Sequence, residues 1–197
     1  MRTTALSAAL LVLCAAPAQA RNALIAQGQA VVVAKSALTI TPGREWNRMG
    51  ARPGRTSETW TLDGDGLNDV TFYGGIDTDR ALFREVSKRL KPLPHFSSRM
   101  LLTDIPALLE TSYRIALATP LMTIDTIAPD TFVGAKGVVF TYTFTKPDEE
   151  VRRKGEGHAA IVAGKLYMAT FEAPEIYYYD RDVAAYRAIV ASARIVG

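Results

Sequence analysis

The stretch 137–194 constrains the fold more than any other part of this chain. Segment 137–144 alternates its side chains between two faces, one of them apolar and aromatic, which predicts a half-buried strand. Segments 159–162 and 166–173 are rich in apolar residues and predict two more strands, joined by a tight turn at 164–165. We therefore expect three strands of one antiparallel sheet in this part of the chain.

The same stretch ends in a predicted helix over 180–194. Asp180 is the expected N-cap, and Asp182 in the first turn suits the positive end of the helix dipole. Apolar side chains recur on one face at helical spacing: Val183, Tyr186, Ile189, Val190 and Ala193. The opposite face is mostly alanine. We therefore expect the helix to be covered on both sides or to carry a contact surface.

The front of the chain predicts further strands. They are expected at 30–33, 37–40, 58–62, 69–73 and 121–127, where apolar, β-branched and aromatic residues gather. The last of them should end in a turn at residues 128–130. We also expect an exposed, arginine-rich loop over residues 45–57.

A second helix is predicted after Thr103, its expected N-cap, with Pro106 tolerated in the first turn. Its apolar face is formed by Ile105, Leu108, Leu109, Ser112 and Ala116. Two prolines in 91–96 argue against regular structure there, and Thr119-Pro120 should end the helix. These elements predict one α+β domain, 21–197, with helices against the faces of a mainly antiparallel sheet.

Residues 1–20 read as a signal peptide. Arg2 gives a positive start, an apolar run follows, and Ala-Gln-Ala at 18–20 forms a small-residue cleavage site. We expect export to the periplasm or the medium, with a mature start at Arg21. The alternative is a lipid anchor on Cys14, although the residue before it is a leucine where lipoprotein signals need a small side chain.

Composition excludes several classes of function. The chain is 48% hydrophobic and 22% charged, which is typical of a globular protein, and its net charge of +3 is too small to indicate nucleic-acid binding. No apolar stretch beyond the signal is long enough to cross a bilayer. Cleavage after Ala20 would also remove the only cysteine and exclude disulfides.

The acidic stretch 63–69 has two interpretations. Its two Asp-Gly pairs between extended segments predict a hairpin turn. The alternative is a calcium loop with Asp63, Asp65 and Asp69 as ligands. That reading leaves Thr61 and Phe72 at positions where carboxylates belong, so the hairpin is favoured.

No motif in the sequence indicates catalysis or a cofactor. His95 and His158 are the only histidines, and no zinc-ligand spacing, nucleophile elbow, Walker loop or dinucleotide fingerprint accompanies them. We expect both histidines to be structural and no cofactor to be bound. The enzymatic alternative is a hydrolase or metal enzyme that pairs one histidine with Asp63 or Asp65.

The candidate contact residues are aromatic. Tyrosines gather at a predicted strand-to-helix junction, and such side chains are frequent at interfaces. The candidate binding residues are Trp46, His95, Phe96, Tyr177, Tyr178 and Tyr179. The basic run 152–154 follows acidic residues, and this mixture predicts a solvated strand edge.

A family resemblance rests on the C-terminal half. Residues 164–174 read Gly-Lys-Leu-Tyr-Met-Ala-Thr-Phe-Glu-Ala-Pro, and Tyr178 and a helix ending in Ile-Val-Ala-Ser-Ala-Arg-Ile at 189–195 follow. This pattern resembles the Mog1/PsbP-like fold, in which a Lys-Leu-Tyr strand leads to a helix ending near Ser-x-Arg. Residues 40–43 and Trp46 are compatible with it. The resemblance implies an α/β/α sandwich, and the fuller pattern is similar to exported, uncharacterised proteobacterial envelope proteins.

The sequence therefore favours a non-enzymatic exported protein, a binding or accessory module for an envelope protein or a small ligand. The first alternative is a small-ligand or lipid carrier with a pocket between sheet and helix. The second is the His/carboxylate enzyme. A fold of this kind serves unrelated functions, so the resemblance names no catalytic residues.

Overall fold

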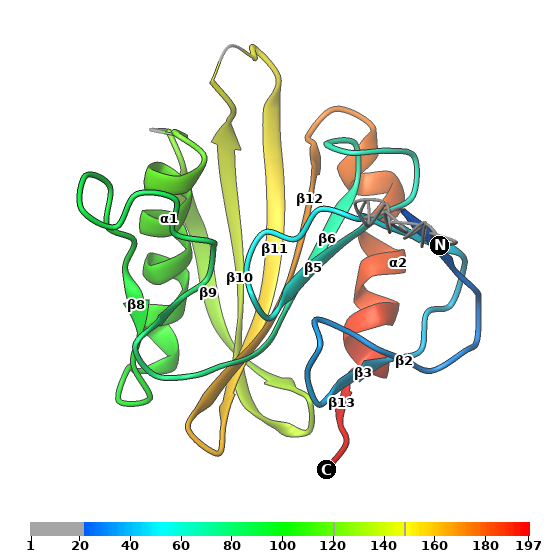
Figure 1. The fold of residues 1–197 in the computed structure, drawn as a ribbon. Helices are drawn as coiled ribbons and strands as arrows, with labels where there is room; N and C mark the ends of the chain where they lie inside the picture. The colour runs from blue at the N-terminus through cyan, green and yellow to red at the C-terminus, as the bar shows by residue number, and fades with distance from the viewer. Residues whose placement is uncertain (1–21, 120, 148) are drawn as a thin grey trace, which may run out of the picture.

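One large antiparallel sheet organises the computed structural model, which describes residues 22–119, 121–147 and 149–197. Its eight strands lie in the order β1-β4-β5-β6-β12-β11-β10-β9, and every neighbouring pair is antiparallel (Figure 1). In that order the strands are Ala23–Ile25, Trp46–Arg48, Ser57–Thr61, Asp69–Ile76, Lys165–Pro174, Arg152–Val162, Ala135–Thr145 and Thr123–Phe132.

Two small sheets and two helices complete the fold. One sheet joins β13 (Arg194–Ile195), β3 (Leu38–Ile40) and β2 (Val31–Val32), and the other pairs β7 (Arg80–Ala81) with β8 (His95–Phe96). The helices are α1 (Ile105–Ala116), entered through a 3-10 turn at Leu102–Asp104, and α2 (Tyr178–Ser192). Pairing of β13 with β3 brings the C-terminal end of the described chain back to its N-terminal part.

The two helices cover opposite faces of the large sheet (Figure 1). On the α1 face, buried side chains of the helix pack on aromatic residues of β10 and β6: Leu109, Tyr113, Phe140, Tyr142 and Tyr73. On the α2 face, the packing joins Tyr186 and Ile189 to Trp60, Phe72 and Phe171. The expected α/β/α sandwich around an antiparallel sheet is confirmed.

Strand β11 lies in the middle of the C-terminal hairpins and carries two glycines that the packing requires. A Cβ atom on Gly155 would collide with the ring of Tyr142, and one on Gly157 would collide with the ring of Phe140. The rings on β10 therefore lie across β11, and the absence of side chains there allows this close packing.

The expectation of a solvated edge at 152–154 is wrong. Strand β11 begins at Arg152 and is paired on both sides, with β10 and with β12. Arg153 is buried because Glu149 and the carbonyl of Gly66 accept its hydrogen bonds. A charged segment can enter the interior of a sheet when partners from other elements neutralise it.

The predicted turn at 128–130 is also wrong, because β9 continues through it to Phe132. Pro129 pairs with Val138 on the one side where β9 has a neighbour. Strand β9 forms the edge of the sheet, and an edge strand tolerates proline because one row of its N–H groups needs no partner.

The helix starts differ from the predictions by one or two residues. Helix α2 begins at Tyr178, so Asp180 lies in its first turn and Tyr177, with φ of 75°, stands at the cap position. Helix α1 begins at Ile105 after Asp104. His95 and Phe96 form the short strand β8 in a segment expected to be irregular. The alanine face of α2 is exposed, so this helix is covered on one side only.

Candidate functional site: a cationic cavity and its apolar neighbour

A cavity of about 980 Å³ opens where the end of β6 meets three other segments. Its walls come from loop 52–56, from the segment 80–88 and from Lys35 in the turn between β2 and β3. Ile76 and Asp77 close it at the end of β6. Volumes of roughly 300–1,000 Å³ are usual for small-ligand sites. We call it the cationic cavity.

Backbone contacts hold these walls in place. The N–H of Arg84 donates to the carbonyl of Pro53 at 2.8 Å, which ties segment 80–88 to loop 52–56. Arg80 pairs with the fully buried Phe96 in the β7–β8 ladder, so the core anchors it. A Cβ atom on Gly54 would collide with the carbonyl oxygen of Leu82, and a glycine therefore permits the close approach.

Positive charge dominates the lining. Six basic side chains face two carboxylates there, an excess of four positive charges, although the whole chain carries only +3. Both carboxylates already have cationic partners, since Asp77 lies 2.8 Å from the Nζ of Lys165 and Glu85 lies 3.6 Å from that of Lys88. Four of the lining cations have no carboxylate within 4.0 Å among the described residues: Lys35, Arg55, Arg80 and Arg84.

Arg52 is the least exposed cation of the cavity. One of its terminal nitrogens lies 3.1 Å from the Oε2 of buried Glu58, whose other oxygen accepts a hydrogen bond from the Trp60 indole at 2.9 Å. The second terminal nitrogen, Nη1, is buried and has no hydrogen-bond partner in the described part of the chain. A buried donor without a partner is costly, and an anion in the cavity would satisfy it.

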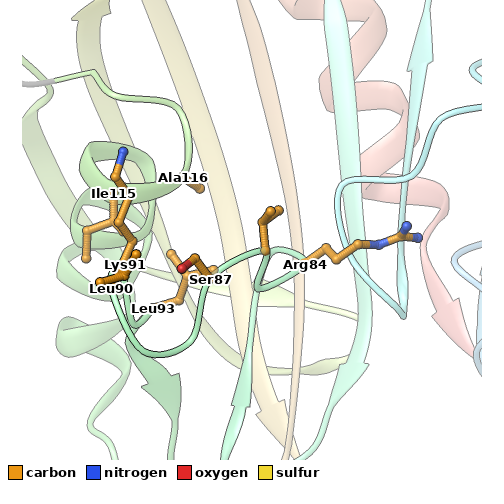
Figure 2. Close-up of a pocket in the computed structure, with 8 residues that line it drawn as sticks. Arg84, Ser87, Leu90, Lys91, Leu93, Ile115 and Ala116 are labelled. Carbon is orange, nitrogen blue, oxygen red and sulfur yellow. The ribbon is translucent and has the colours of Figure 1, made fainter.

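A second cavity of about 410 Å³ adjoins the first and is largely apolar. It lies between the segment 84–93 and the C-terminal end of α1 (Figure 2). Its lining comprises Arg84, Val86, Ser87, Leu90, Lys91, Leu93, Ile115 and Ala116. We call it the apolar cavity. Arg84 belongs to the walls of both cavities.

Most of the contact residues predicted from the sequence do not lie at the cavities. Trp46, Phe96 and Tyr179 offer no surface to a partner, because each is buried among the apolar side chains of the core. His95 is exposed and places its Nε2 atom 3.3 Å from Glu85, on the wall of the cationic cavity. Of the four, only His95 touches the site.

Tyr177 and Tyr178 lie at the start of α2, away from both cavities. Tyr177 is 65% exposed and packs edge-on against Tyr178 with ring centroids 5.3 Å apart. The guanidinium of Arg181 stacks on both rings, 4.8 Å from the centroid of Tyr178. This pair stays a candidate contact surface, partly covered by its own arginine.

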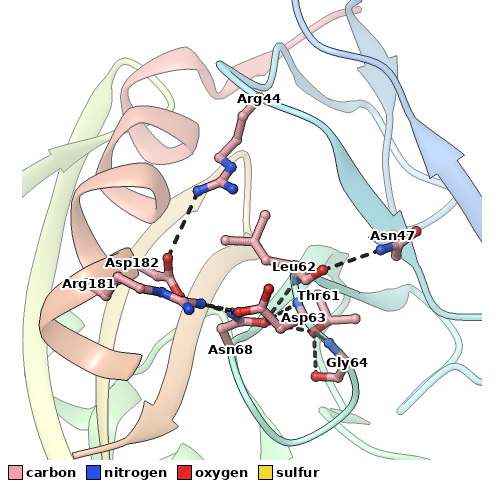
Figure 3. A network of polar contacts seen from close by, with 9 residues as sticks. All are labelled: Arg44, Asn47, Thr61, Leu62, Asp63, Gly64, Asn68, Arg181 and Asp182. Atoms are coloured by element: carbon pink, nitrogen blue, oxygen red, sulfur yellow. Dashed lines mark hydrogen bonds and ion pairs between the residues drawn. The ribbon is translucent and has the colours of Figure 1, made fainter. Parts of the chain in front are cut away.

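The acidic stretch forms the predicted hairpin turn between β5 and β6, and Asn68 organises it (Figure 3). The carboxylate of Asp63 is engaged by Arg181 and, at 2.8 Å, by the amide of Asn68. Asp69 accepts the N–H of Gly66 at 2.8 Å. Within the described residues no three or more His, Cys, Asp or Glu side chains gather so as to hold a metal ion. The geometry therefore gives the calcium alternative no support.

His158 does meet carboxylates, but not the predicted Asp63 or Asp65. Its Nδ1 atom lies 2.7 Å from Asp130 and its Nε2 atom 3.1 Å from Glu156, which also binds Arg187. Burial alone would raise the pKa of Glu156, but hydrogen bonds from Arg187 and His158 lower it to about 2. The histidine lines neither cavity and is buried beside Tyr186. This environment is that of a structural ion-pair cluster.

Sequence reasoning missed the cationic cavity. The signal was present in two places, the arginines of residues 52–55, within a segment expected to be an exposed loop, and the basic residues of 80–91. Nothing local to either segment indicates that they face each other. Among the described residues, no helix is both long and apolar enough to cross a membrane.

Comparison with solved structures identifies the fold. Cyanobacterial PsbP (CyanoP) from Synechocystis sp. PCC 6803 superposes with a TM-score of 0.53 at 14% identity, over 94% of this chain and 99% of that chain. This chain has a Mog1/PsbP-like fold. LpqN, involved in cell envelope biogenesis of Mycobacterium tuberculosis, gives a TM-score of 0.34 at 7% identity, over 90% of this chain and 91% of that one.

No family model matches the chain, and no curated protein matches it. At 14% identity the similarity to CyanoP describes the fold alone, and a shared fold does not determine function.

Proposed function

We propose that this protein is a non-enzymatic, exported binding protein of the cell envelope that holds an anionic group of its ligand in the cationic cavity. The observation that carries the proposal is the set of four cations on the cavity wall without a carboxylate within 4.0 Å in the described residues. Like charges gathered in a concave site repel one another, and an anion relieves that repulsion.

Binding fits this site better than catalysis does. The two carboxylates of the lining are already engaged by lysines, and His95 is tied to Glu85. Arginine and lysine donate hydrogen bonds and attract anions, and the guanidinium group suits phosphate and carboxylate geometry. The signal peptide expected at 1–20 supports a place in the envelope, and the Mog1/PsbP-like fold is compatible with an accessory module.

The proposal is tested by calorimetric titration of the purified protein with inorganic phosphate and with citrate at low ionic strength. The informative variant is Arg55→Gln/Arg80→Gln, because both side chains line the cavity without a carboxylate partner. The matched control is Arg89→Gln/Arg99→Gln, which removes the same charge from exposed positions outside the lining.

We expect saturable anion binding that weakens about tenfold or more in the cavity variant and stays unchanged in the control, since each charge-assisted hydrogen bond contributes roughly 1.5–3 kcal/mol. Absence of saturable binding for both anions would overturn the proposal. Equal weakening in both double variants would also overturn it, since binding would then follow net charge and not the cavity.

A further inference from the structure

We infer that the ligand is an amphiphile, with its anionic head group in the cationic cavity and its hydrocarbon chain in the apolar cavity. This inference rests on the proposed function and adds the chemical class of the ligand. Four features of the molecule support it: the shared wall of the two cavities, the exposed apolar side chains beside it, the position of Arg84, and the positive charge of the lining.

The shared wall is the segment 83–91, whose residues divide between the cavities. Phe83, Glu85 and Lys88 line the cationic cavity. Val86, Ser87, Leu90 and Lys91 line the apolar one. A ligand with a charged end and an apolar end would meet complementary surfaces on the two sides of this short segment.

Apolar side chains stand in solvent at the apolar cavity. Val86 is 94% exposed and Leu90 is 83% exposed, although both lie in its lining. Isolated exposed apolar residues are ordinary, but here they flank a concavity that also contains Leu93 and Ile115. A hydrocarbon chain in this cavity would remove that surface from water, which is the usual driving force for binding of apolar groups.

Arg84 joins the two environments. It lines both cavities, and Figure 2 shows its side chain extending away from the group formed by Leu90, Leu93 and Ile115. A long arginine side chain commonly places its methylene stem on apolar surface and its guanidinium in a polar region. Arg84 therefore marks the point where the head group of the amphiphile would give way to its chain.

Charge complementarity selects an anionic amphiphile over a neutral or cationic one. The cationic cavity has an excess of four positive charges, and Lys91 adds another at the apolar cavity. The shared chemistry is a phosphate or carboxylate carrying a hydrocarbon chain. Its source can be a free amphiphile or a lipid withdrawn from a membrane.

The test compares three soluble probes, namely decyl phosphate below its micellar concentration, inorganic phosphate and uncharged decyl maltoside. The variant Ala116→Trp fills the apolar cavity from an exposed position at the end of α1. Ala107→Trp is the control, because Ala107 is exposed on the same helix and lies outside both linings. Thermal unfolding of both variants establishes that the fold is kept.

We expect decyl phosphate to bind at least about tenfold more tightly than inorganic phosphate, and this advantage to disappear in Ala116→Trp but not in Ala107→Trp. Arg55→Gln/Arg80→Gln should weaken both anions. A flotation experiment with phosphatidylglycerol vesicles distinguishes a free amphiphile from a membrane lipid. Transfer of lipid to the protein, without the protein floating stably with the vesicles, indicates a lipid withdrawn from the membrane.

The outcomes separate the two proposals. Equal affinity for decyl phosphate and phosphate overturns the amphiphile and leaves anion binding standing. Unchanged decyl phosphate binding in Ala116→Trp overturns the assignment of the chain to the apolar cavity. Binding of decyl maltoside as tight as that of decyl phosphate, or stable flotation without binding of the soluble probe, also overturns the inference. Failure of both anions to bind removes the proposed function as well.

Discussion

Asp69 and Glu172 occupy directly opposed positions on the neighbouring strands β6 and β12, so their carboxyl groups share one face of the sheet. Asp69 accepts the N–H of Gly66 at 2.8 Å, and Glu172 accepts the hydroxyl of Tyr142 at 2.7 Å. Burial raises the pKa of Asp69 to about 7, with Glu172 adding to the effect, and burial also raises the pKa of Glu172. Both opposed carboxyl groups therefore hold their protons to a higher pH than an exposed carboxyl group does.

The raised pKa of Asp69 predicts that the free energy of unfolding falls as pH rises. The folded state keeps a proton on Asp69 that the unfolded chain releases near pH 4, so the contribution to stability is complete below that pH and is lost as pH rises through about 7. From about pH 5 to about pH 8 the free energy of unfolding should drop on the order of 2 kcal/mol. Asp69→Asn should flatten this dependence in urea unfolding curves. An equal drop in the variant would show that another group is responsible.

Asn68 is predicted to be a major determinant of the turn between β5 and β6. Its side-chain oxygen accepts the N–H groups of Leu62 and Asp63 at 3.0 and 2.9 Å, and its amide donates to Asp182 of α2 at 2.9 Å (Figure 3). Asn68→Ala leaves buried groups without partners and should lower the free energy of unfolding by about 2–3 kcal/mol.

The matched control for that variant is Asn47→Ala in the same network. Asn47 is exposed and makes one long hydrogen bond of 3.4 Å to the carbonyl of Leu62. Its removal should change stability by less than about 0.5 kcal/mol in the same denaturant experiment. Similar losses in the two variants would contradict the role assigned to Asn68.

Gly157 is predicted to tolerate no side chain. Gly157→Ala would bring a methyl group into the ring of Phe140, and this overpacking should cost about 1–3 kcal/mol in thermal or chemical unfolding. Gly43→Ala is the opposite case, because its Cβ atom would meet nothing within 4 Å and the unfolded chain would lose freedom. We expect that variant to be neutral or slightly stabilising. A neutral Gly157→Ala would mean that the ring moves aside easily.

The signal peptide expected at residues 1–20 predicts where the exported protein begins. Residues 1–20 lie outside the described part of the chain, and the exported protein should begin at Arg21 by intact-mass spectrometry. Cys14→Ser should leave export and mass unchanged. A mass that includes a lipid on Cys14, abolished by this substitution, would establish the anchored alternative.

Local pattern was sufficient for much of the fold. The alternation of side chains in 137–144 predicted strand β10, and the Asp-Gly pairs of 63–66 predicted the hairpin turn between β5 and β6. The spacing of Leu108 and Leu109 predicted the buried face of α1. Each of these features depends on residues a few positions apart, so the sequence contains the whole signal.

Partners distant in sequence decided what local pattern missed. The start of β11 looked solvated, but the carbonyl of Gly66 on the β5–β6 turn accepts a hydrogen bond from Arg153, and Arg187 of α2 neutralises Glu156. His158 likewise finds Asp130 on β9, two strands away in the sheet. A sequence shows the charge of such residues but not the group that compensates it.

The sequence by itself predicted the long strands of the sheet, both helices, the export signal and, through the resemblance of its C-terminal half, the fold. Only the tertiary structure brought Lys35, Arg52, Arg80 and Arg84 from separate segments to one cavity at the end of β6. Secondary structure follows from neighbours along the chain, whereas a binding site follows from which segments the sheet order and the loop contacts bring together. The cationic cavity belongs to the second kind.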